Sequence, residues 1–213
     1  MYRYILFDFD GTLIDSNDII LKSLQETAMK HTGKELDHDA LQSILGKPLA
    51  IQMKAIDEGQ WEVMDTFYRT YYRAHRDALT KTFEGIKPML DALKDAGCKM
   101  GIVSNKGRSG IHHALEKFEL GSYFDAVISS DDVVEKKPKV ECVDKALALL
   151  SGSPSETLLV GDSIHDIECG KNAGVHTALV GWTIIDRHRI MHLEPEYVIE
   201  TPNELVNIIK LAN

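Results

Sequence analysis

The sequence predicts an α/β protein with a Rossmann-like core, in which helices cover both faces of a parallel sheet and a helical cap domain is inserted. An apolar run at residues 4–7 suits a strand that is buried on both faces. Beyond residue 83, helical segments alternate with short apolar runs, which is the pattern of a parallel sheet. Residues 15–82 show helical spacing and little strand signal, which indicates the insert.

The elements after the first strand follow in a regular order. Strands are expected at residues 100–103, 126–129, 158–160 and 177–180, with a weaker one at 197–199. Crossover helices are expected near 86–96, 108–119, 139–150 and 164–173. Residues 1–14 and 83–213 therefore form the predicted core, and residues 15–82 form the predicted cap domain, with helix breaks at 32–33, 46–48 and 58–59.

Composition excludes several classes of function. The chain has 213 residues, of which 24 are basic and 33 acidic, for a net charge of -9. No stretch gathers Lys and Arg into a track for nucleic acid, and no apolar run is long enough for a membrane span. The cysteines Cys98, Cys142 and Cys169 are widely spaced, which favours buried thiols over disulfides or zinc. A strand begins almost at residue 1 without a leader pattern, so we expect a cytoplasmic protein.

Two carboxylates follow the first strand directly. Asp8 and Asp10 lie two residues apart, so in an extended segment their side chains share one face and crowd negative charge into one pocket. Such a pocket attracts a hard divalent cation. Taken alone, the Asp-x-Asp-Gly pattern also fits a calcium loop or a polar turn.

Polar residues follow two further strands. Ser104 and Asn105 precede a helix whose free N–H groups favour an anion, although a plain N-terminal turn is equally consistent with this segment. Lys137 lies before another helix, where it could place a fixed positive charge beside a phosphoryl group or could be a solvated surface lysine.

A fourth strand end carries two more carboxylates after Gly161. Asp162 lies at the end of the strand, and Asp166 is expected on the first turn of the next helix. There Asp166 could cap N–H groups or reach a metal shell through water. Ordinary helix capping explains one of these aspartates but not both, and four candidate sites at four strand ends favour a common function.

The whole chain resembles the haloacid dehalogenase superfamily, specifically its phosphohydrolases with a helical, C1-type cap. The first motif is matched by Asp-Phe-Asp-Gly-Thr-Leu at residues 8–13, the second by Ser104, the third by Lys137-Pro138 and the fourth by residues 161–166. Residues 15–17 and 181–183 add a similarity to the phosphoglycolate phosphatase and bacterial pyrophosphatase branch.

The resemblance implies a role for each carboxylate. Asp8 would attack phosphorus to form an aspartyl-phosphate, and Asp10 would first protonate the leaving group and then activate water. Mg²⁺ would be the cofactor, held by the Asp8 carboxylate, the Asp10 backbone carbonyl and Asp162. Asp166 would support the metal either directly or through water.

The resemblance also implies the residues that bind the substrate. Ser104, Lys137 and the amides around Gly11 would hold the phosphoryl oxygens. Thr12 and Asn105, which lie in the same motifs, are further candidate contacts to the substrate. Lys47, in a loop of the insert, could contact an anionic group of the substrate or could equally be a solvated lysine.

The function expected from this resemblance is a magnesium-dependent phosphohydrolase acting on a small phosphorylated metabolite, such as phosphoglycolate or pyrophosphate. Carbon–halogen cleavage is disfavoured, because true haloacid dehalogenases have no acid at the position of Asp10. The alternatives are a sugar phosphomutase of the same superfamily and a non-catalytic phospho-aspartate signalling module. We expect a monomer or homodimer, with no nucleic-acid partner and no membrane association.

Overall fold

The computed structural model describes residues 1–212 and divides into two compact units. The first unit consists of Met1–Ile14 and the chain from Thr82 onward, and the second consists of Asp15–Lys81. No helix among residues 1–212 is both long and apolar enough to cross a membrane. Each unit is described by itself.

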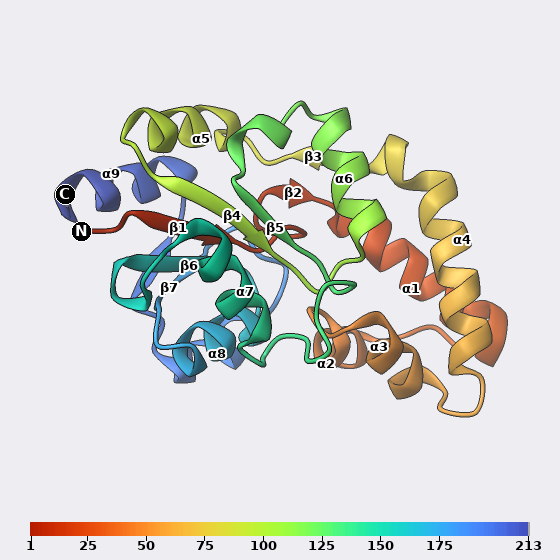
Figure 1. The fold of residues 1–213 in the computed structure, drawn as a ribbon. Helices are drawn as coiled ribbons and strands as arrows, with labels where there is room; N and C mark the ends of the chain where they lie inside the picture. The colour runs from red at the N-terminus through yellow and green to blue at the C-terminus, as the bar shows by residue number, and fades with distance from the viewer. Residues whose placement is uncertain (213) are drawn as a thin grey trace. The chain divides into compact units, whose positions relative to one another are not determined.

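The first unit is built on a six-stranded sheet with the order β5-β4-β1-β6-β7-β8, in which every pair of neighbours is parallel (Figure 1). The strands are β1 (Tyr4–Phe7), β4 (Lys99–Val103), β5 (Ala126–Ile128), β6 (Thr157–Gly161), β7 (His176–Val180) and β8 (Tyr197–Ile199). Because β1 pairs with both β4 and β6, the first strand of the chain lies at the centre of the sheet.

Helices cover both faces of this sheet (Figure 1). One face packs against α5 (Ile86–Asp95), α6 (Arg108–Lys117) and α9 (Pro202–Ala212), and the other against α7 (Glu141–Leu150) and α8 (Ile164–Asn172). Side chains of β1 alternate between the two cores: Ile5 and Phe7 join the first, whereas Leu6 joins the second. This alternation explains why the first strand is apolar at every position.

The predicted fold class is confirmed; the predicted strands and helices of the core differ from expectation only at their ends, whereas α9 and the short strands at residues 14–15 and 81–82 were not predicted. The helix expected from residue 139 begins at Glu141, because residues 136–139 form a turn closed by the Lys139 N–H on the Lys136 carbonyl. Short 3₁₀ helices complete the unit at η1 (Gly121–Tyr123), η2 (Pro154–Glu156), η3 (Arg187–Arg189) and η4 (Met191–Leu193).

The second unit is helical. Its helices are α1 (Asn17–Thr32), α2 (His38–Ile44), α3 (Leu49–Ile56) and α4 (Trp61–Leu79). Ile19, Leu24, Met53 and Met64 are fully buried and form part of its apolar interior. Two short strands, β2 (Ile14–Asp15) and β3 (Lys81–Thr82), pair at the point where the chain enters and leaves this unit.

Candidate active site

The carboxyl ends of the three central strands carry polar side chains that are buried. Asp8 follows β1, Ser104 follows β4 and Asp162 follows β6, and the side chains of all three are largely excluded from solvent. The Asp8 N–H extends the ladder to β6 by donating to the Val160 carbonyl at 2.8 Å. The parallel register therefore brings residues far apart in the sequence to one edge of the sheet.

Three carboxylates gather at this edge. Ligand atoms of Asp8, Asp162 and Asp166 all lie within 4.8 Å of one another, and all three residues are buried. Gly11 makes the close approach to Asp162 feasible: a Cβ added there would lie 2.2 Å from Asp162 Oδ2, and its φ of +79° is also one that favours glycine. The motif glycine is thus needed for space and for backbone conformation.

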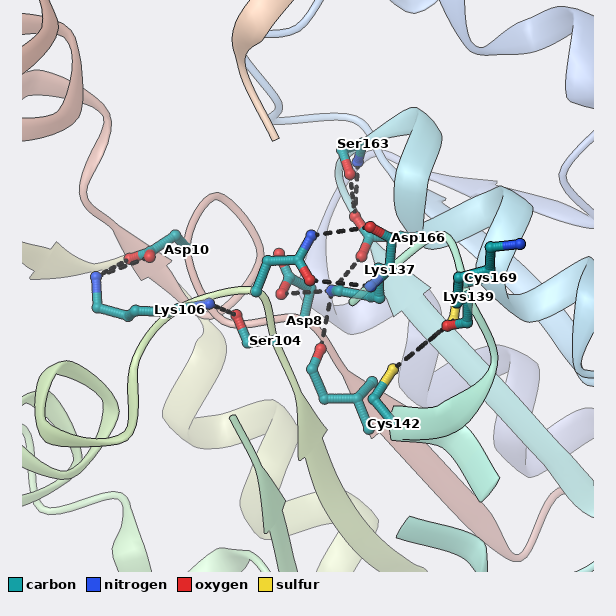
Figure 2. A network of polar contacts seen from close by, with 12 residues as sticks. Asp8, Asp10, Ser104, Lys106, Lys137, Lys139, Cys142, Ser163, Asp166 and Cys169 are labelled. Atoms are coloured by element: carbon teal, nitrogen blue, oxygen red, sulfur yellow. Dashed lines mark hydrogen bonds and ion pairs between the residues drawn. The ribbon is translucent and has the colours of Figure 1, made fainter. Parts of the chain in front are cut away.

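Lys137 lies within this carboxylate cluster. Its Nζ donates to Asp8 Oδ1 at 2.8 Å, to Asp166 Oδ1 at 2.5 Å and to the Val103 carbonyl at 2.8 Å, as Figure 2 shows. Asn105 fixes the lysine backbone, because its amide accepts from the Lys137 N–H at 3.0 Å and donates to the Lys137 carbonyl at 3.2 Å. The lysine is therefore an internal counter-ion held by both its ends.

The burial of this cluster changes its protonation. Burial, helped by the charge of Asp166 and opposed by Lys137, raises the pKa of Asp8 to about 6. Burial together with Asp166 and Asp8 raises the pKa of Asp162 well above its usual value. Burial would also raise the pKa of Asp166, but the Lys137 charge and hydrogen bonds from Lys137 and Ser163 hold it below its usual value.

Lys137 itself stays charged. Burial would lower its pKa, but the negative charges of Asp166 and Asp8 outweigh burial and raise the pKa above its usual value. The cluster consequently contains one fixed cation and carboxylates that repel one another when all are ionised. Such a set stabilises any further positive charge that binds between them.

Asp166 is the carboxylate with the most hydrogen bonds in the cluster. Besides Lys137, it accepts from the Ser163 N–H at 2.9 Å and from Ser163 Oγ at 2.6 Å, which is a capping box at the start of α8. Both of its oxygens are thus engaged within the protein. This arrangement favours Asp166 as a support for a metal shell over a direct ligand.

Asp10 points to a different partner. Both of its carboxylate oxygens accept from Lys106 Nζ, at 2.9 and 2.7 Å (Figure 2). Ser104 Oγ lies beside this pair and accepts from the Lys106 N–H at 3.3 Å. The side chain of Asp10 is therefore held apart from the hydrogen bonds that link Asp8, Lys137 and Asp166.

The other residues that were predicted to contact the substrate are Gly11, Thr12 and Lys47. The Gly11 N–H donates to the Ile14 carbonyl at 2.9 Å. Thr12 Oγ1 is buried and has no hydrogen-bond partner among the described residues, so it could bond a ligand oxygen. Lys47 belongs to the second unit, in the loop between α2 and α3, where its carbonyl accepts from Gln52 Nε2.

Sequence reasoning gave no role to two residues that contact the site. Lys106 lies in a bend between β4 and the expected helix at 108–119, where no periodicity signals its contact with Asp10. Thr183 Oγ1 donates to the carbonyl and to Oδ2 of Asp162, at 3.0 and 3.2 Å. No spacing signal places Thr183 there, because it follows β7 in an irregular segment.

The donor set fits a hard divalent cation. All of the clustered groups are carboxylates, the ligand type that Mg²⁺ and Ca²⁺ prefer. The combined charge of the ionised carboxylates also exceeds that of the Lys137 ammonium. The same groups offer a buried nucleophile in Asp8, beside a lysine able to stabilise charge on a phosphoryl group.

Comparison with known proteins agrees with this geometry. The family model described as haloacid dehalogenase-like hydrolase matches residues 5–180. The chain belongs to this family. That membership confirms the resemblance on which the expected motifs rest.

Several relatives of this haloacid dehalogenase-like hydrolase are named as phosphatases. It is 40% identical over 209 residues to pyrophosphatase PpaX of Anoxybacillus flavithermus, covering 98% of this chain and 97% of the relative. A Clostridium acetobutylicum structure described as a predicted phosphatase is 26% identical, with a TM-score of 0.87 and 99% of each chain covered. A Haemophilus somnus structure described as a predicted phosphoglycolate phosphatase has a TM-score of 0.85 at 20% identity, covering 100% of this chain and 98% of that one, and thus shares its fold.

Removing one clustered charge is expected to stabilise the metal-free protein. In EDTA at neutral pH, Asp162→Asn should unfold about 2–4 °C higher than the unchanged chain, the shift that 1 kcal/mol gives for a chain of this size. Because the pKa of Asp162 is raised in the folded state, protonated Asp162 stabilises the unchanged chain fully below the usual aspartate pKa of 3.8. This contribution to the free energy of unfolding is lost as pH rises through the folded-state pKa. The difference in unfolding midpoint between Asp162→Asn and the unchanged chain should therefore become smaller as pH falls toward 3.8.

Thermal unfolding followed by circular dichroism tests this expectation. Asp95→Asn, at an exposed position on α5, is the matched control and should leave the midpoint unchanged. Adding Mg²⁺ should raise the midpoint of the unchanged chain more than that of Asp162→Asn. A lower midpoint for Asp162→Asn in EDTA would contradict the repulsion inferred from the cluster.

Proposed function

We propose that this chain is a magnesium-dependent phosphatase that acts on a small phosphorylated metabolite through an aspartyl-phosphate. The observation that carries the proposal is the buried Asp8 whose carboxylate is hydrogen-bonded to Lys137 and clustered with Asp162 and Asp166. Phosphoryl transfer depends mainly on alignment and on neutralising charge, and this cluster supplies both. Family membership and relatives named as phosphatases support the same assignment.

The proposed reaction divides between two aspartates. An Asp8 oxygen forms a bond to phosphorus as the bond to the leaving oxygen breaks, and that oxygen takes a proton from Asp10, which enters the step as the protonated carboxyl group and leaves it as the carboxylate. Water then attacks the phosphorus of the aspartyl-phosphate, Asp10 takes a proton from it, and the Asp8 carboxylate is released with phosphate. Lys137 and Ser104 hold the phosphoryl oxygens, and Asn105 keeps the lysine in position.

Mg²⁺ is proposed to be held by the Asp8 carboxylate, the Asp10 backbone carbonyl and Asp162, with Asp166 as support. When bound, it neutralises charge on the phosphoryl group and on the carboxylates around it. Thr183 contributes by holding the Asp162 carboxylate through its hydroxyl. Thr12 and the amides near Gly11 remain candidate contacts to the phosphoryl oxygens.

The substrate class follows from the relatives and not from the cluster. Pyrophosphate is favoured by the PpaX relative, and a phosphoglycolate-like monoester by the structure described as a phosphoglycolate phosphatase. An alkoxide leaving group needs the acid Asp10 more than a phosphate leaving group does. The helical unit, residues 15–81, is proposed to act as a cap that selects the substrate, with Lys47 as a candidate contact to an anionic group.

A phosphate-release panel tests the function. The panel contains pyrophosphate, phosphoglycolate, sugar phosphates and 4-nitrophenyl phosphate, each with Mg²⁺ and with EDTA. We expect release from at least one small substrate, at rates that fall by about 10²-fold or more in EDTA, since one charge-stabilising group is commonly worth that much.

The same panel separates the alternatives. Conversion of a sugar phosphate without phosphate release, followed by NMR, would identify a mutase. Stable phosphorylation without turnover would identify a signalling module. Release that is equal with Mg²⁺ and with EDTA would rule out the metal dependence proposed here.

A further inference from the structure

The ion pair between Lys106 and Asp10 is more enclosed than a surface pair. The two side chains are 13% and 21% exposed, and the lysine ammonium donates to both carboxylate oxygens, at 2.9 and 2.7 Å. Both contacts have the length of charge-assisted hydrogen bonds. The carboxylate is thus held at two points and not at one.

The backbone of Lys106 is fixed on both sides. Its N–H donates to Ser104 Oγ at 3.3 Å, and its carbonyl accepts from the Ser130 N–H at 3.0 Å. These bonds link Lys106 to Ser104, which directly follows β4, and to Ser130, which lies just after β5. The backbone position of Lys106 is therefore fixed by the ends of β4 and β5.

The stem of Lys106 runs close to α6 at Gly110. A Cβ added at Gly110 would lie 2.9 Å from Lys106 Cε and 3.5 Å from its Cδ and Cγ, so the stem runs through the space that a side chain at residue 110 would fill. A free lysine side chain has large rotamer entropy. The missing side chain at Gly110 leaves the space beside α6 through which the stem runs to reach Asp10.

We propose that Lys106 is a positioning residue that fixes the Asp10 carboxylate for proton transfer. The inference rests on the proposed function, in which Asp10 serves first the leaving oxygen and then the attacking water. Proton transfer requires the carboxylate within hydrogen-bond reach of each of these atoms. An Asp10 carboxyl group that contacts Lys106 Nζ keeps a single location through the two steps, as the acid in the first and as the carboxylate in the second, and a misplaced group loses rate steeply.

Leaving-group dependence tests this role, because a poor leaving group needs proton donation more than a good one does. Phenyl phosphate and 4-nitrophenyl phosphate have similar shapes but poor and good leaving groups. In Lys106→Met, kcat/KM should fall about 10–100-fold for phenyl phosphate and at most about 3-fold for 4-nitrophenyl phosphate. Gly110→Ala keeps the lysine but displaces its stem, and should produce the same discrimination; it decides the question alone if Lys106→Met does not fold.

Matched controls separate positioning from general damage. Lys87→Met removes an exposed lysine paired with Glu119, and Gly121→Ala adds a Cβ in open space; neither should change the ratio of the two substrates. Asp10→Asn should show the strongest discrimination, and Asp10→Asn combined with Lys106→Met should lose nothing further.

The outcomes distinguish this inference from the proposed function. If Asp10→Asn does not discriminate between the two phosphates, the acid role of Asp10 in the proposed function is wrong. If Asp10→Asn discriminates but Lys106→Met affects both substrates equally or neither, Lys106 does not act through Asp10 and the inference is overturned.

Discussion

Asp8→Asn is expected to lower phosphate release by at least about 10⁴-fold on every substrate of the panel, because it replaces the proposed nucleophile with an amide that cannot attack phosphorus. The fold should persist, since the amide has nearly the shape of the carboxylate and its oxygen can still accept from Lys137 Nζ. Mass spectrometry after rapid acid quenching should find a phosphoryl adduct on the unchanged chain and none on Asp8→Asn.

Two further variants make this expectation sharp. Asp95→Asn, at an exposed aspartate, should retain full activity. Asp10→Asn should still acquire the adduct from 4-nitrophenyl phosphate and should lose it slowly, because water then attacks the phosphorus without a base to take its proton. An adduct on Asp8→Asn, or turnover within 10-fold of the unchanged chain, would eliminate Asp8 as the nucleophile.

Lys137→Met is expected to produce the largest loss of stability at the site. The side chain is 3% exposed and donates to two buried carboxylates, so its removal leaves those charges without their counter-ion. Breaking a buried ion pair from one side typically costs about 3–5 kcal/mol of unfolding free energy. Urea unfolding in EDTA at neutral pH measures the loss, and turnover should fall together with it.

The adjacent lysine supplies the control. Lys136→Met, at a partly exposed position, should leave the unfolding free energy within about 0.5 kcal/mol of that of the unchanged chain, as surface substitutions usually do. Adding Asp166→Asn to Lys137→Met should recover part of the loss, because one unpaired charge is removed with its partner. A loss below about 1 kcal/mol for Lys137→Met would mean that the carboxylates do not depend on this lysine.

The fold could be predicted from local patterns because each strand is a short apolar run closed by a turn. Burial on both faces makes β1 and the inner residues of β6 and β7 apolar, and parallel pairing then places their ends at one edge. The order of the strands was not predictable in this way. Runs of similar composition do not specify which neighbours pair, and it is the sheet order that puts β1 between β4 and β6.

The candidate site also contains residues whose positions could be predicted from local patterns and residues whose positions could not. Asp8 and Asp162 follow their strands directly, so their positions were implied by the periodicity. The contacts of Lys106, Asn105 and Thr183 depend on side-chain rotamers and on irregular segments, which periodicity does not describe. Asn105 is the clearest example, since no periodicity signals that its amide bonds the backbone of Lys137.

The central place of β1 has a consequence for synthesis on the ribosome. Tyr4 pairs with Lys99 on one side and with Thr157 on the other, so the first strand to be made waits for partners that are translated much later. Until then its apolar residues and unpaired backbone groups stay open to wrong contacts. We therefore expect a nascent chain that ends before β6 to require a chaperone, and the acidic cluster to form only after most of the protein has been translated.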